Sequence, residues 1–387
     1  MGLSNDCRHT HDPEEIVFGD SQNNYRIPAL LYIEKWKKFL AFAESRTSPA
    51  DQDAKDLVMR TGTRDTVGVK WSSMKVLTKA TKDNYRTMNP CPVFETSSET
   101  LFLFFICIEG HTAEISLQPC QTRLCYITTQ DEHLGDDSWR ELKDLTDDII
   151  VVEKENNKKL SEYKTFAVGP GHGVEAKRGS SVRTGETSTG SDGARLLIPA
   201  YVKISDDKSY SLVLYSDDGG QSWEAGQQLR KHLSGECQVA QIQGTELYCN
   251  ARSSCRRVEA VSDDAGAQFT KYLDSSLKDS CHGCQGSVLA VPDQGSSNTW
   301  LLYSHPTQRK RRDLGVRRRE ASLQGAWGKP LVIHPGNSGY SDLAQCEEEG
   351  RFACLMECRE AKNLQIVFKE FSLCEIPKPK CSPCCLL

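Results

Sequence analysis

The chain has 387 residues, of which 38% are hydrophobic and 26% charged, and its 48 Lys and Arg against 53 Asp and Glu give a formal net charge of −5. This soluble globular composition excludes collagen-like, coiled-coil and disordered chains. The near-neutral balance also argues against a general nucleic-acid-binding protein, which would carry a basic excess. Length alone would allow two or three domains.

The first residues lack the features of a secretion signal. Residues 1–15 are polar and contain no apolar core of the kind that a signal peptide needs. The longest apolar run of the chain, residues 101–108, is far shorter than the roughly 20 residues of a transmembrane helix. We therefore expect a cytoplasmic protein that is not secreted.

Short β-strands recur along the chain, whereas helical spacing of apolar residues is rare. Each apolar run is bounded by Gly, Pro, Asn, Asp or Ser, a pattern typical of an all-β fold with many short strands. The predicted strands are residues 29–33, 39–43, 101–108, 195–202, 211–215, 287–291, 300–304 and 364–368.

A repeated motif follows several of these strands. Ser216–Trp223 reads SDDGGQSW, Ser262–Phe269 repeats its Ser-x-Asp-x-Gly-x-x-aromatic skeleton, and a degenerate copy runs from Thr129 to Trp139. The terminal aromatic residues, at positions 139, 223 and 269, lie 84 and 46 residues apart, which is about two blades and one blade of a β-propeller. Because Ser and Asp can bond to the backbone of a tight turn, we predict a structural role for the motif.

Three polar segments interrupt the strand pattern. Residues 154–163 are highly charged and residues 177–193 are rich in Ser, Thr and Gly, so both are expected to be surface insertions. The third, residues 308–320, holds seven Lys and Arg. We expect it to be a solvated loop; a basic patch facing an anionic membrane and a nuclear signal are the alternatives.

The 17 cysteines are the unusual part of the composition. An odd number cannot all pair within one chain, and thiols stay reduced in the cytosol, so most are expected to be buried free thiols. Cys281-His-Gly-Cys284 has the spacing of zinc ligands, but no second pair accompanies it. No metal is therefore predicted.

The C-terminal residues 377–387 form a Pro- and Cys-rich tail that ends in Cys-Cys-Leu-Leu. These last four residues fit the C-a-a-X prenylation pattern, and neighbouring cysteines could accept palmitate, so Cys381, Cys384 and Cys385 are candidates for lipid attachment. Peripheral or lipid-anchored contact with a membrane would follow. The alternative is an unmodified tail.

Tyr25-Arg-Ile-Pro28 and the repeated motif, the Asp box, are hallmarks of sialidases. From about Gly19 to Phe371 the chain resembles the vertebrate sialidases of the cytosolic and plasma-membrane-associated type. Further matching motifs follow in the same order: MNPCP (88–92), TFAVGPGH (165–172), ECQVA (236–240), NAR (250–252), GCQGS (283–287) and YSDL (340–343). The resemblance implies a six-bladed β-propeller, and hence one catalytic domain at 1–376 followed by the tail at 377–387.

The resemblance also implies hydrolysis of terminal α-linked sialic acid with retention of configuration, without metal or organic cofactor. Sialic acid carries a carboxylate on its anomeric carbon, which the planar fork of arginine binds well. By the family pattern, Arg26, Arg252 and Arg311 hold this carboxylate. The stretch before Asp313-Leu-Gly315 is one residue short, so Arg312 is the alternative to Arg311.

The same substrate carboxylate favours a phenol as nucleophile, because an attacking carboxylate would be repelled. Sialidases are the tyrosine exception among glycosidases, and the resemblance assigns the nucleophile to Tyr340. A phenol with a pKa near 10 needs a base, and the residue that matches is Glu236.

The acid/base catalyst of the family follows the residue that matches Arg46. The interval selects Asp51, with Asp53 as the alternative, and its role predicts a raised pKa. Glu357 matches the glutamate that orients Arg26. The residues that match outer substrate contacts are Arg46, Met88 and Asn89 near the ring substituents, Glu114 near the glycerol chain, and Tyr201. Where the family commonly has a second tyrosine, this sequence has Lys203, so side-chain or linkage preference is expected to differ.

These residues favour an exo-α-sialidase whose partners are sialylated glycolipids, glycoproteins and oligosaccharides, and not nucleic acid. The rival hypothesis is a lectin-like propeller that binds sialic acid without turnover. A scaffold propeller would leave the matched Arg, Tyr and Glu residues unexplained. A trans-sialidase would need an aromatic acceptor platform, which we do not find in the sequence.

Overall fold

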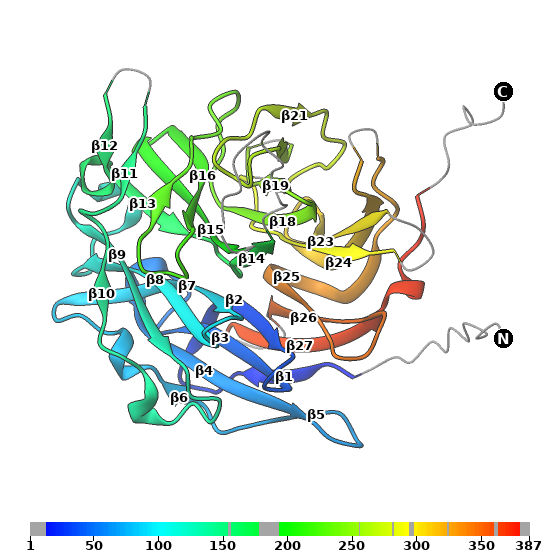
Figure 1. The fold of residues 1–387 in the computed structure, drawn as a ribbon. Coiled ribbons are helices and arrows are strands. Elements are labelled where there is room, and N and C mark those ends of the chain that lie inside the picture. Colours follow the sequence, from blue (N-terminus) through cyan, green and yellow to red (C-terminus); the bar gives the residue numbers. More distant parts are fainter. Residues whose placement is uncertain are drawn as a thin grey trace.

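Antiparallel strands make up the fold of the computed structural model, which describes residues 13–153, 156–177, 193–254, 256–280, 282–293, 298–322, 325–359 and 363–379. Among these residues the secondary structure consists of strands β1 to β27 and six short 3-10 helices (Figure 1). The helices are η1 (Asp51–Asp53), η2 (Thr78–Ala80), η3 (Glu114–Ser116), η4 (Asp136–Ser138), η5 (Leu160–Glu162) and η6 (Leu373–Glu375). The prediction of an all-β fold is confirmed.

The strands form sheets from consecutive stretches of chain. The first sheet contains β2 (Asn24–Ile33), β3 (Lys38–Arg46), β4 (Ala54–Arg64) and β5 (Val69–Trp71), with β6 (Lys75–Val76) also paired to β4. The second contains β7 (Tyr85–Glu95), β8 (Thr100–Glu109), β9 (Thr122–Thr129) and β10 (Lys143–Asp144). Strands β11 (Ile150–Val151) and β12 (Lys158–Lys159) form a separate pair.

The third sheet contains β13 (Thr165–Val168), β15 (Ala194–Ser205), β16 (Lys208–Ser216) and β17 (Glu224–Ala225), with β14 (Val174–Lys177) also paired to β15. The fourth contains β18 (Cys237–Gln243), β19 (Glu246–Ala251), β20 (Val258–Ser262) and β21 (Lys271–Leu273). A seven-stranded sheet contains, in spatial order, β1 (Glu15–Phe18), β27 (Gln365–Ser372), β26 (Arg351–Cys358), β25 (Leu331–Gln345), β24 (Arg312–Glu320), β23 (Thr299–Gln308) and β22 (Ser287–Pro292).

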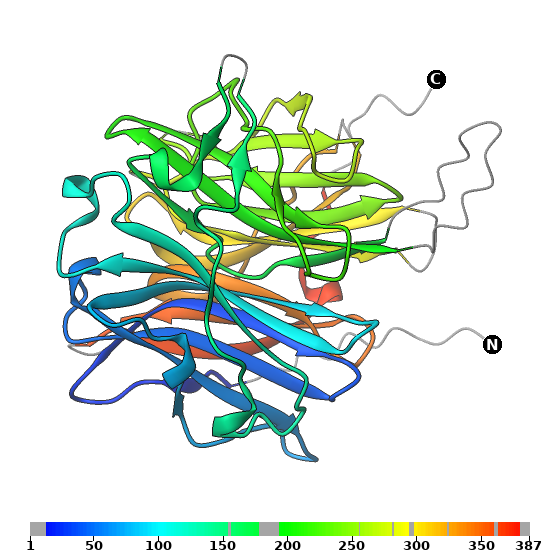
Figure 2. The same cartoon turned by 60° about the vertical axis from the view of Figure 1, so that its left-hand side comes forward.

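Two features of the seven-stranded sheet are not apparent from the sequence. Strand β25 pairs with β24 through its first half, Leu331–Asn337, and with β26 through its second half, Ser338–Gln345. Strand β1 pairs with β27, so the two ends of the described chain lie side by side, as the blue and red strands of Figures 1 and 2 show.

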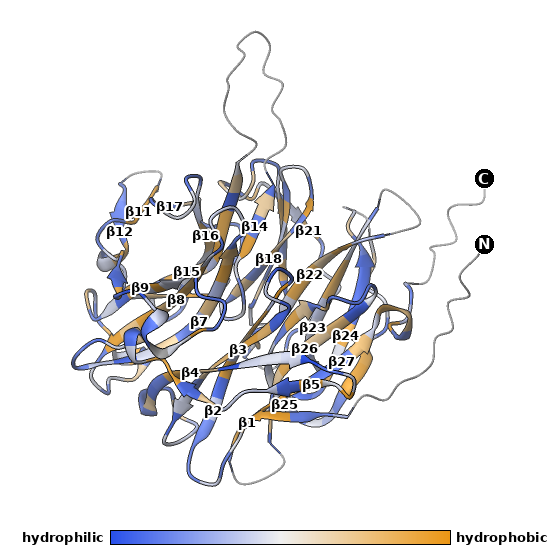
Figure 3. Ribbon diagram, turned by 60° about the horizontal axis from the view of Figure 1, so that its bottom comes forward, coloured by the Kyte–Doolittle hydropathy of each residue, from blue (hydrophilic) through white to orange (hydrophobic). Residues whose placement is uncertain are grey.

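The hydrophobic core consists of layers between successive sheets, and Figure 3 shows hydrophobic residues gathered along the strands. One layer joins Leu40 of β3 to Phe105 of β8, and the next joins Phe104 of β8 to Ile198 of β15. Further layers join the third sheet to the fourth, the fourth to the seven-stranded sheet, and the seven-stranded sheet to the first. Both faces of these sheets are therefore buried, which explains the near-continuous apolar runs in the sequence.

The Asp boxes have the predicted structural role. In the first copy the Ser216 hydroxyl accepts from the Gly220 amide at 2.8 Å, and Asp218 accepts from the Ser222 amide at 2.9 Å. Trp223 then packs edge-on against Phe104 of the neighbouring sheet, with ring centroids 4.6 Å apart. Each box thus closes a turn and places an aromatic ring between two sheets.

The basic segment 308–320 is a solvated turn only at residues 309–311, and the prediction of a loop is wrong for the rest of it. Residues 312–320 form β24, and both Arg318 and Arg319 are buried. Arg318 stacks over the Trp300 ring at 5.3 Å, and Arg319 bonds to Glu259 at 3.1 Å. An aromatic face and a buried carboxylate stabilise these guanidinium groups inside the sheet, although the Nε atoms of both arginines are buried without a hydrogen bond.

Candidate active site

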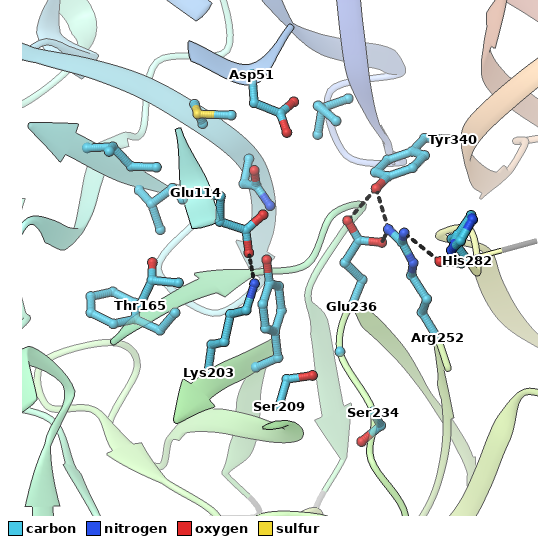
Figure 4. Close-up of a pocket in the computed structure, with 18 of the residues that line it drawn as sticks. Asp51, Glu114, Thr165, Lys203, Ser209, Ser234, Glu236, Arg252, His282 and Tyr340 are labelled. Carbon is cyan, nitrogen blue, oxygen red and sulfur yellow. Dashed lines mark hydrogen bonds and ion pairs between the residues drawn. The ribbon is translucent and has the colours of Figure 1, made fainter. Parts of the chain in front are cut away.

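A cavity of about 710 Å³ gathers residues from four of the sheets and from the loops beside the fourth sheet at one place. Figure 4 shows part of its wall, with Asp51, Glu114, Glu236, Arg252 and Tyr340 facing the same space. All but one of the predicted catalytic and substrate-binding residues line this cavity: Arg26, Arg46, Asp51, Met88, Asn89, Glu114, Tyr201, Glu236, Arg252, Arg311 and Tyr340. Glu357 is the exception and lies behind Arg26.

Tyr340, in the second half of β25, forms the centre of a tight polar cluster. Its hydroxyl donates to Glu236 Oε1 at 2.5 Å and accepts from Arg252 at 2.8 Å. The same Arg252 nitrogen bonds to the other oxygen of Glu236 at 2.8 Å (Figure 4). Glu236 is therefore held in position to take the phenolic proton.

The environment of Tyr340 favours the protonated phenol. Burial raises its pKa well above the usual value and the nearby Glu236 charge raises it further, whereas Arg252 and Arg26 act in the opposite direction. A phenol of this kind does not ionise by itself at neutral pH. Such a phenol needs a base before it can act as a nucleophile, and Glu236 is the carboxylate that lies in position to accept its proton.

Three arginines surround the Tyr340 ring. The guanidinium carbons of Arg26 and Arg311 lie 5.4 and 5.6 Å from the ring centroid, and Arg252 bonds to the hydroxyl. Arg311 is held by the Gly283 carbonyl at 2.8 Å, while Arg312 is exposed and does not line the cavity. The geometry therefore selects Arg311 over Arg312 as the third cation of the cluster.

Glu357 fixes the position of Arg26 through backbone as well as side-chain contacts. It accepts from Arg26 Nε at 3.1 Å, from the Ile27 amide at 3.0 Å and from the Tyr340 amide at 3.1 Å. Ile27 has a positive φ of 58° at the irregularity in β2, which turns its amide toward Glu357. A side chain at Gly339 would lie 2.2 Å from the Glu357 carboxylate, so glycine is required there.

Asp51, at the start of η1, faces the cavity and contacts two guanidinium groups. Its carboxylate lies 2.6 Å from Arg46 and 3.3 Å from Arg26. Burial acts to raise the pKa of Asp51, but the charges of Arg46 and Arg26 outweigh it and the pKa lies below the usual value. The prediction of a raised pKa is thus wrong for this set of charges. Asp53 bonds to Ser48 and does not line the cavity.

Binding of an anion between the arginines should reverse this effect on Asp51. A substrate carboxylate beside Arg26 would offset its positive charge, so the pKa of Asp51 should rise when a sialic acid is bound. We expect an NMR titration of labelled aspartate carboxyl groups, assigned with Asp51→Asn, to give a higher pKa with bound ligand than without. An unchanged or lower value would contradict this electrostatic account.

Below Asp51 lies a carboxylate that sequence reasoning missed. Glu44 of β3 is fully buried; it binds Arg46 through Nε at 2.8 Å and accepts from the Asn89 amide at 2.7 Å. Asn89 also has a positive φ of 58° and bonds to the Val168 carbonyl at 3.2 Å. Glu44 thus ties β3 to β7 and keeps Arg46 directed at Asp51.

Another wall of the cavity is polar and charged. Lys203 of β15 bonds to Glu114 of η3 at 3.2 Å (Figure 4). Tyr201 lies two residues before Lys203 on the same strand and also lines the cavity. Met88 lines the cavity from β7. Arg86, buried on β7, bonds to the carbonyls of Gly110 and Thr112 at 2.6 Å and so holds the loop that leads to Glu114. Sequence reasoning missed this role of Arg86.

A second missed residue, Asp279, organises the loop beside Arg252 and Arg311. Its buried carboxylate accepts from the amides of Ser280 and Cys284 at 2.8 Å, from Arg257 at 3.0 Å and from His305 at 3.0 Å. The loop it holds supplies the His282 carbonyl, which accepts from Arg252 at 2.9 Å. Asp279 is therefore a positioning residue for two of the three arginines.

Asp279→Asn should weaken both this loop and the folded state. Burial opposes ionisation of Asp279, but His305 and Arg257 lower its pKa, so ionised Asp279 stabilises the fold above pH about 4 and the contribution fades as pH falls further. We expect a loss of about 3 kcal/mol in urea unfolding at neutral pH, shrinking in acid, and a rise in KM larger than the fall in kcat. A pH-independent stability loss would contradict the charge-based role.

Comparison with known proteins identifies the family. Residues 37–354 match the model of a BNR repeat-like domain. Human sialidase-3 is 40% identical over 408 residues, covering 91% of this chain and 90% of that protein. Mouse sialidase-4 is 34% identical with 91% coverage of both chains, and sialidase-2 of Cricetulus griseus is 35% identical, covering 93% and 95%. The chain belongs to the sialidase family.

Solved structures agree with this assignment at the level of the fold. The intramolecular trans-sialidase from Ruminococcus gnavus superimposes with a TM-score of 0.73 at 14% identity, covering 96% of this chain and 99% of that one. Trypanosoma rangeli sialidase gives 0.70 at 16% identity, covering 93% and 59%. This glycoside hydrolase therefore has a sialidase-like all-β fold.

The cysteines of this sialidase that lie in the described ranges include buried thiols at Cys91, Cys237 and Cys284, as predicted. Cys281, Cys381, Cys384 and Cys385 lie outside the described residues. Within the described part, no group of three or more His, Cys, Asp or Glu side chains could hold a metal ion. No helix there is both long and apolar enough to cross a membrane.

Proposed function

We propose that this sialidase is a retaining exo-α-sialidase in which Tyr340 is the nucleophile, Glu236 its base and Asp51 the acid/base catalyst. The observation that carries the proposal is the bond from the Tyr340 hydroxyl to Glu236 at 2.5 Å within a ring of three arginines. A fixed trio of cations suits a substrate whose reacting carbon bears a carboxylate. A phenol paired with a carboxylate supplies a nucleophile that is neutral until it reacts.

The reaction then proceeds by double displacement. Arg26, Arg252 and Arg311 bind the sialic acid carboxylate, and the Tyr340 oxygen attacks the anomeric carbon as its proton passes to Glu236. The bond to the leaving oxygen breaks while protonated Asp51 donates to that oxygen. In the second step Asp51 takes a proton from water, the water oxygen replaces Tyr340, and the phenol regains its proton from Glu236. Two inversions at the same carbon give net retention.

We also propose that residues 1–376 form one six-bladed propeller. Its blades would be the first to fourth sheets, then β22 to β24 with the first half of β25, and finally the second half of β25 with β26, β27 and β1. The division of pairing along β25 and the hydrophobic layers between successive sheets support this arrangement. Pairing of β1 with β27 would close the last blade.

Sialylated glycolipids such as gangliosides, glycoproteins and oligosaccharides are the proposed substrates. The cavity is open to solvent at Asp51, whose side chain is 46% exposed, so the aglycone can extend outward from the leaving oxygen. A lectin-like propeller is not favoured, because binding alone would need neither Glu236 beside the phenol nor Asp51 beside the arginines.

Stereochemistry of the first product tests the proposal most simply. Proton NMR of the wild-type enzyme acting on an α-sialoside should show α-sialic acid first, followed by slow conversion to the β anomer. Release of β-sialic acid first would indicate a single displacement by water and would contradict a nucleophilic Tyr340. Absence of release would favour the lectin-like alternative.

We propose that the enzyme acts in the cytoplasm and reaches membranes through lipid groups on Cys381, Cys384 or Cys385. These residues lie outside the described residues, so the proposal rests on the C-a-a-X pattern and the clustering of thiols alone. A chain ending at Lys380 should move from the membrane fraction to the soluble fraction of expressing cells and keep its activity on soluble sialosides. Unchanged partition would contradict lipid anchoring.

A further inference from the structure

Two adjoining hollows of about 430 and 310 Å³ lie beside the active-site cavity. They share Lys278, Pro306 and Thr307 in their walls. None of these residues takes part in the proposed reaction. The hollows lie between the end of the fourth sheet and strands β23 and β24, where the hydrophobic layer contains fewer residues than the layers around β8.

Four cations surround the two hollows without carboxylate partners. Arg256, Lys278, Arg309 and Arg317 form no ion pair with any described residue. An isolated β-bridge pairs Arg256 directly with Lys278, which brings two like charges to the same face. Asp279 is the single acidic residue in the walls, and its carboxylate already pairs with Arg257 and His305.

Buried hydroxyl groups in the same walls also lack partners. Ser280 Oγ, in the larger hollow, and Tyr303 Oη, in the smaller, are inaccessible to solvent and make no hydrogen bond, and the two residues are 3% and 2% exposed. Buried polar groups of this kind are normally satisfied. Because neither oxygen is exposed to the hollows, a ligand could not reach them. It is the cations that favour a ligand, since an anionic group in the hollows would offset their mutual repulsion.

The larger hollow is close to the active site because the same two loops line both. Ser280 faces the hollow and His282 the cavity, while Arg309 faces the hollow and Arg311 the cavity. Two residues span at most about 7 Å of backbone. A substrate whose first residue occupies the cavity can therefore reach the hollow with a later residue.

We propose that these hollows bind a second acidic group of the substrate, the carboxylate of another acidic sugar in the same glycan. This inference rests on the proposed function and names the residues that would favour, among the proposed substrates, glycans that carry more than one carboxylate. Concave hollows walled partly by Pro306, Thr307 and Trp327 suit a sugar residue better than they suit a flat lipid surface. The four cations around the hollows complement the negative charge of the sugar carboxylate.

The test compares two substrates and two variants of the full chain. The substrates are lactose carrying one sialic acid and lactose carrying a linear disialyl unit. The double variant Lys278→Gln with Arg309→Gln removes two exposed cations of the hollow. Its control, Lys70→Gln with Arg140→Gln, removes two exposed cations elsewhere and gives the same net charge.

The hollow variant should lose about 5-fold in kcat/KM on the disialyl substrate relative to the monosialyl one, and the difference should shrink at high ionic strength. The control variant should leave the ratio unchanged. An unchanged ratio in the hollow variant, with activity retained on both substrates, would overturn the inference. Failure of the wild type on both substrates would instead count against the proposed function.

Sedimentation with vesicles of phosphatidylserine and phosphatidylcholine separates a glycan site from a lipid site. We expect the hollow variant and the control variant to sediment equally. Loss of vesicle binding by the hollow variant, together with an unchanged substrate ratio, would assign the cations to a membrane surface and contradict the inference.

Discussion

Tyr340→Phe should reduce sialoside hydrolysis by about 10⁴-fold while leaving the fold intact. The substitution removes a single oxygen, which donates to Glu236 and accepts from Arg252. The ring itself, which packs between Arg26 and Arg311, remains. Loss of the nucleophile therefore removes the covalent route, whereas the arginines that bind the substrate carboxylate stay in place.

A matched tyrosine on the surface provides the control for this experiment. Tyr215 also donates its hydroxyl to a glutamate, Glu224, at 2.9 Å, but lies far from the cavity residues in the sheet. Tyr215→Phe should retain activity within about 2-fold, because exposed bonds contribute little. Release of fluorophore from an aryl α-sialoside measures both variants. Activity of Tyr340→Phe within 10-fold of wild type, roughly what loss of one hydrogen bond would cause, would exclude Tyr340 as the nucleophile.

Asp51→Ala should produce a loss that depends on the leaving group. Protonation of the leaving oxygen matters most when the departing alcohol is a poor leaving group, so natural sialosides should lose about 10²- to 10⁴-fold. An aryl sialoside with an activated leaving group needs little protonation in the first step and should lose much less. The measurement is kcat/KM on sialyllactose and on the aryl sialoside for the same preparation.

Asp53→Ala is the control for the acid, because Asp53 lies on the same short helix but bonds to Ser48 outside the cavity. Both substrates should react with it at near wild-type rates. Equal losses on the two substrates in Asp51→Ala would show a general disturbance of Arg46 and Arg26 and would contradict acid catalysis by Asp51.

Much of the fold is predictable from the sequence because its strands are short, apolar and bounded by turn residues. Residues 101–108 and 195–202, for example, fall inside β8 and β15. The division of β25 between two neighbours is not predictable, since nothing in residues 331–345 marks the point where the pairing partner changes. Burial of Arg318 and Arg319 is also not predictable, because a basic run indicates exposure to solvent. Only the fold shows that Trp300 and Glu259 pack against these two side chains.

The candidate site shows the same division between local motifs and distant partners. Tyr340, Glu236, Arg26 and Asp51 belong to motifs that resemblance can transfer one residue at a time. Asp279 and Glu44 stand alone in the sequence, and their importance depends on partners such as His305, 26 residues away, that only the fold brings near. A lone acidic residue of this kind carries no signal in one sequence.

Covalent trapping tests the central claim, that Tyr340 forms a bond to the anomeric carbon. A 2,3-difluorosialic acid loses fluoride from that carbon, while the fluorine on the neighbouring carbon withdraws electrons and slows hydrolysis of the adduct. Mass spectrometry of the digested wild-type enzyme should place one sialyl adduct on the peptide that contains Tyr340, and Tyr340→Phe should give none. An adduct on Glu236, Asp51 or any other residue would contradict the account.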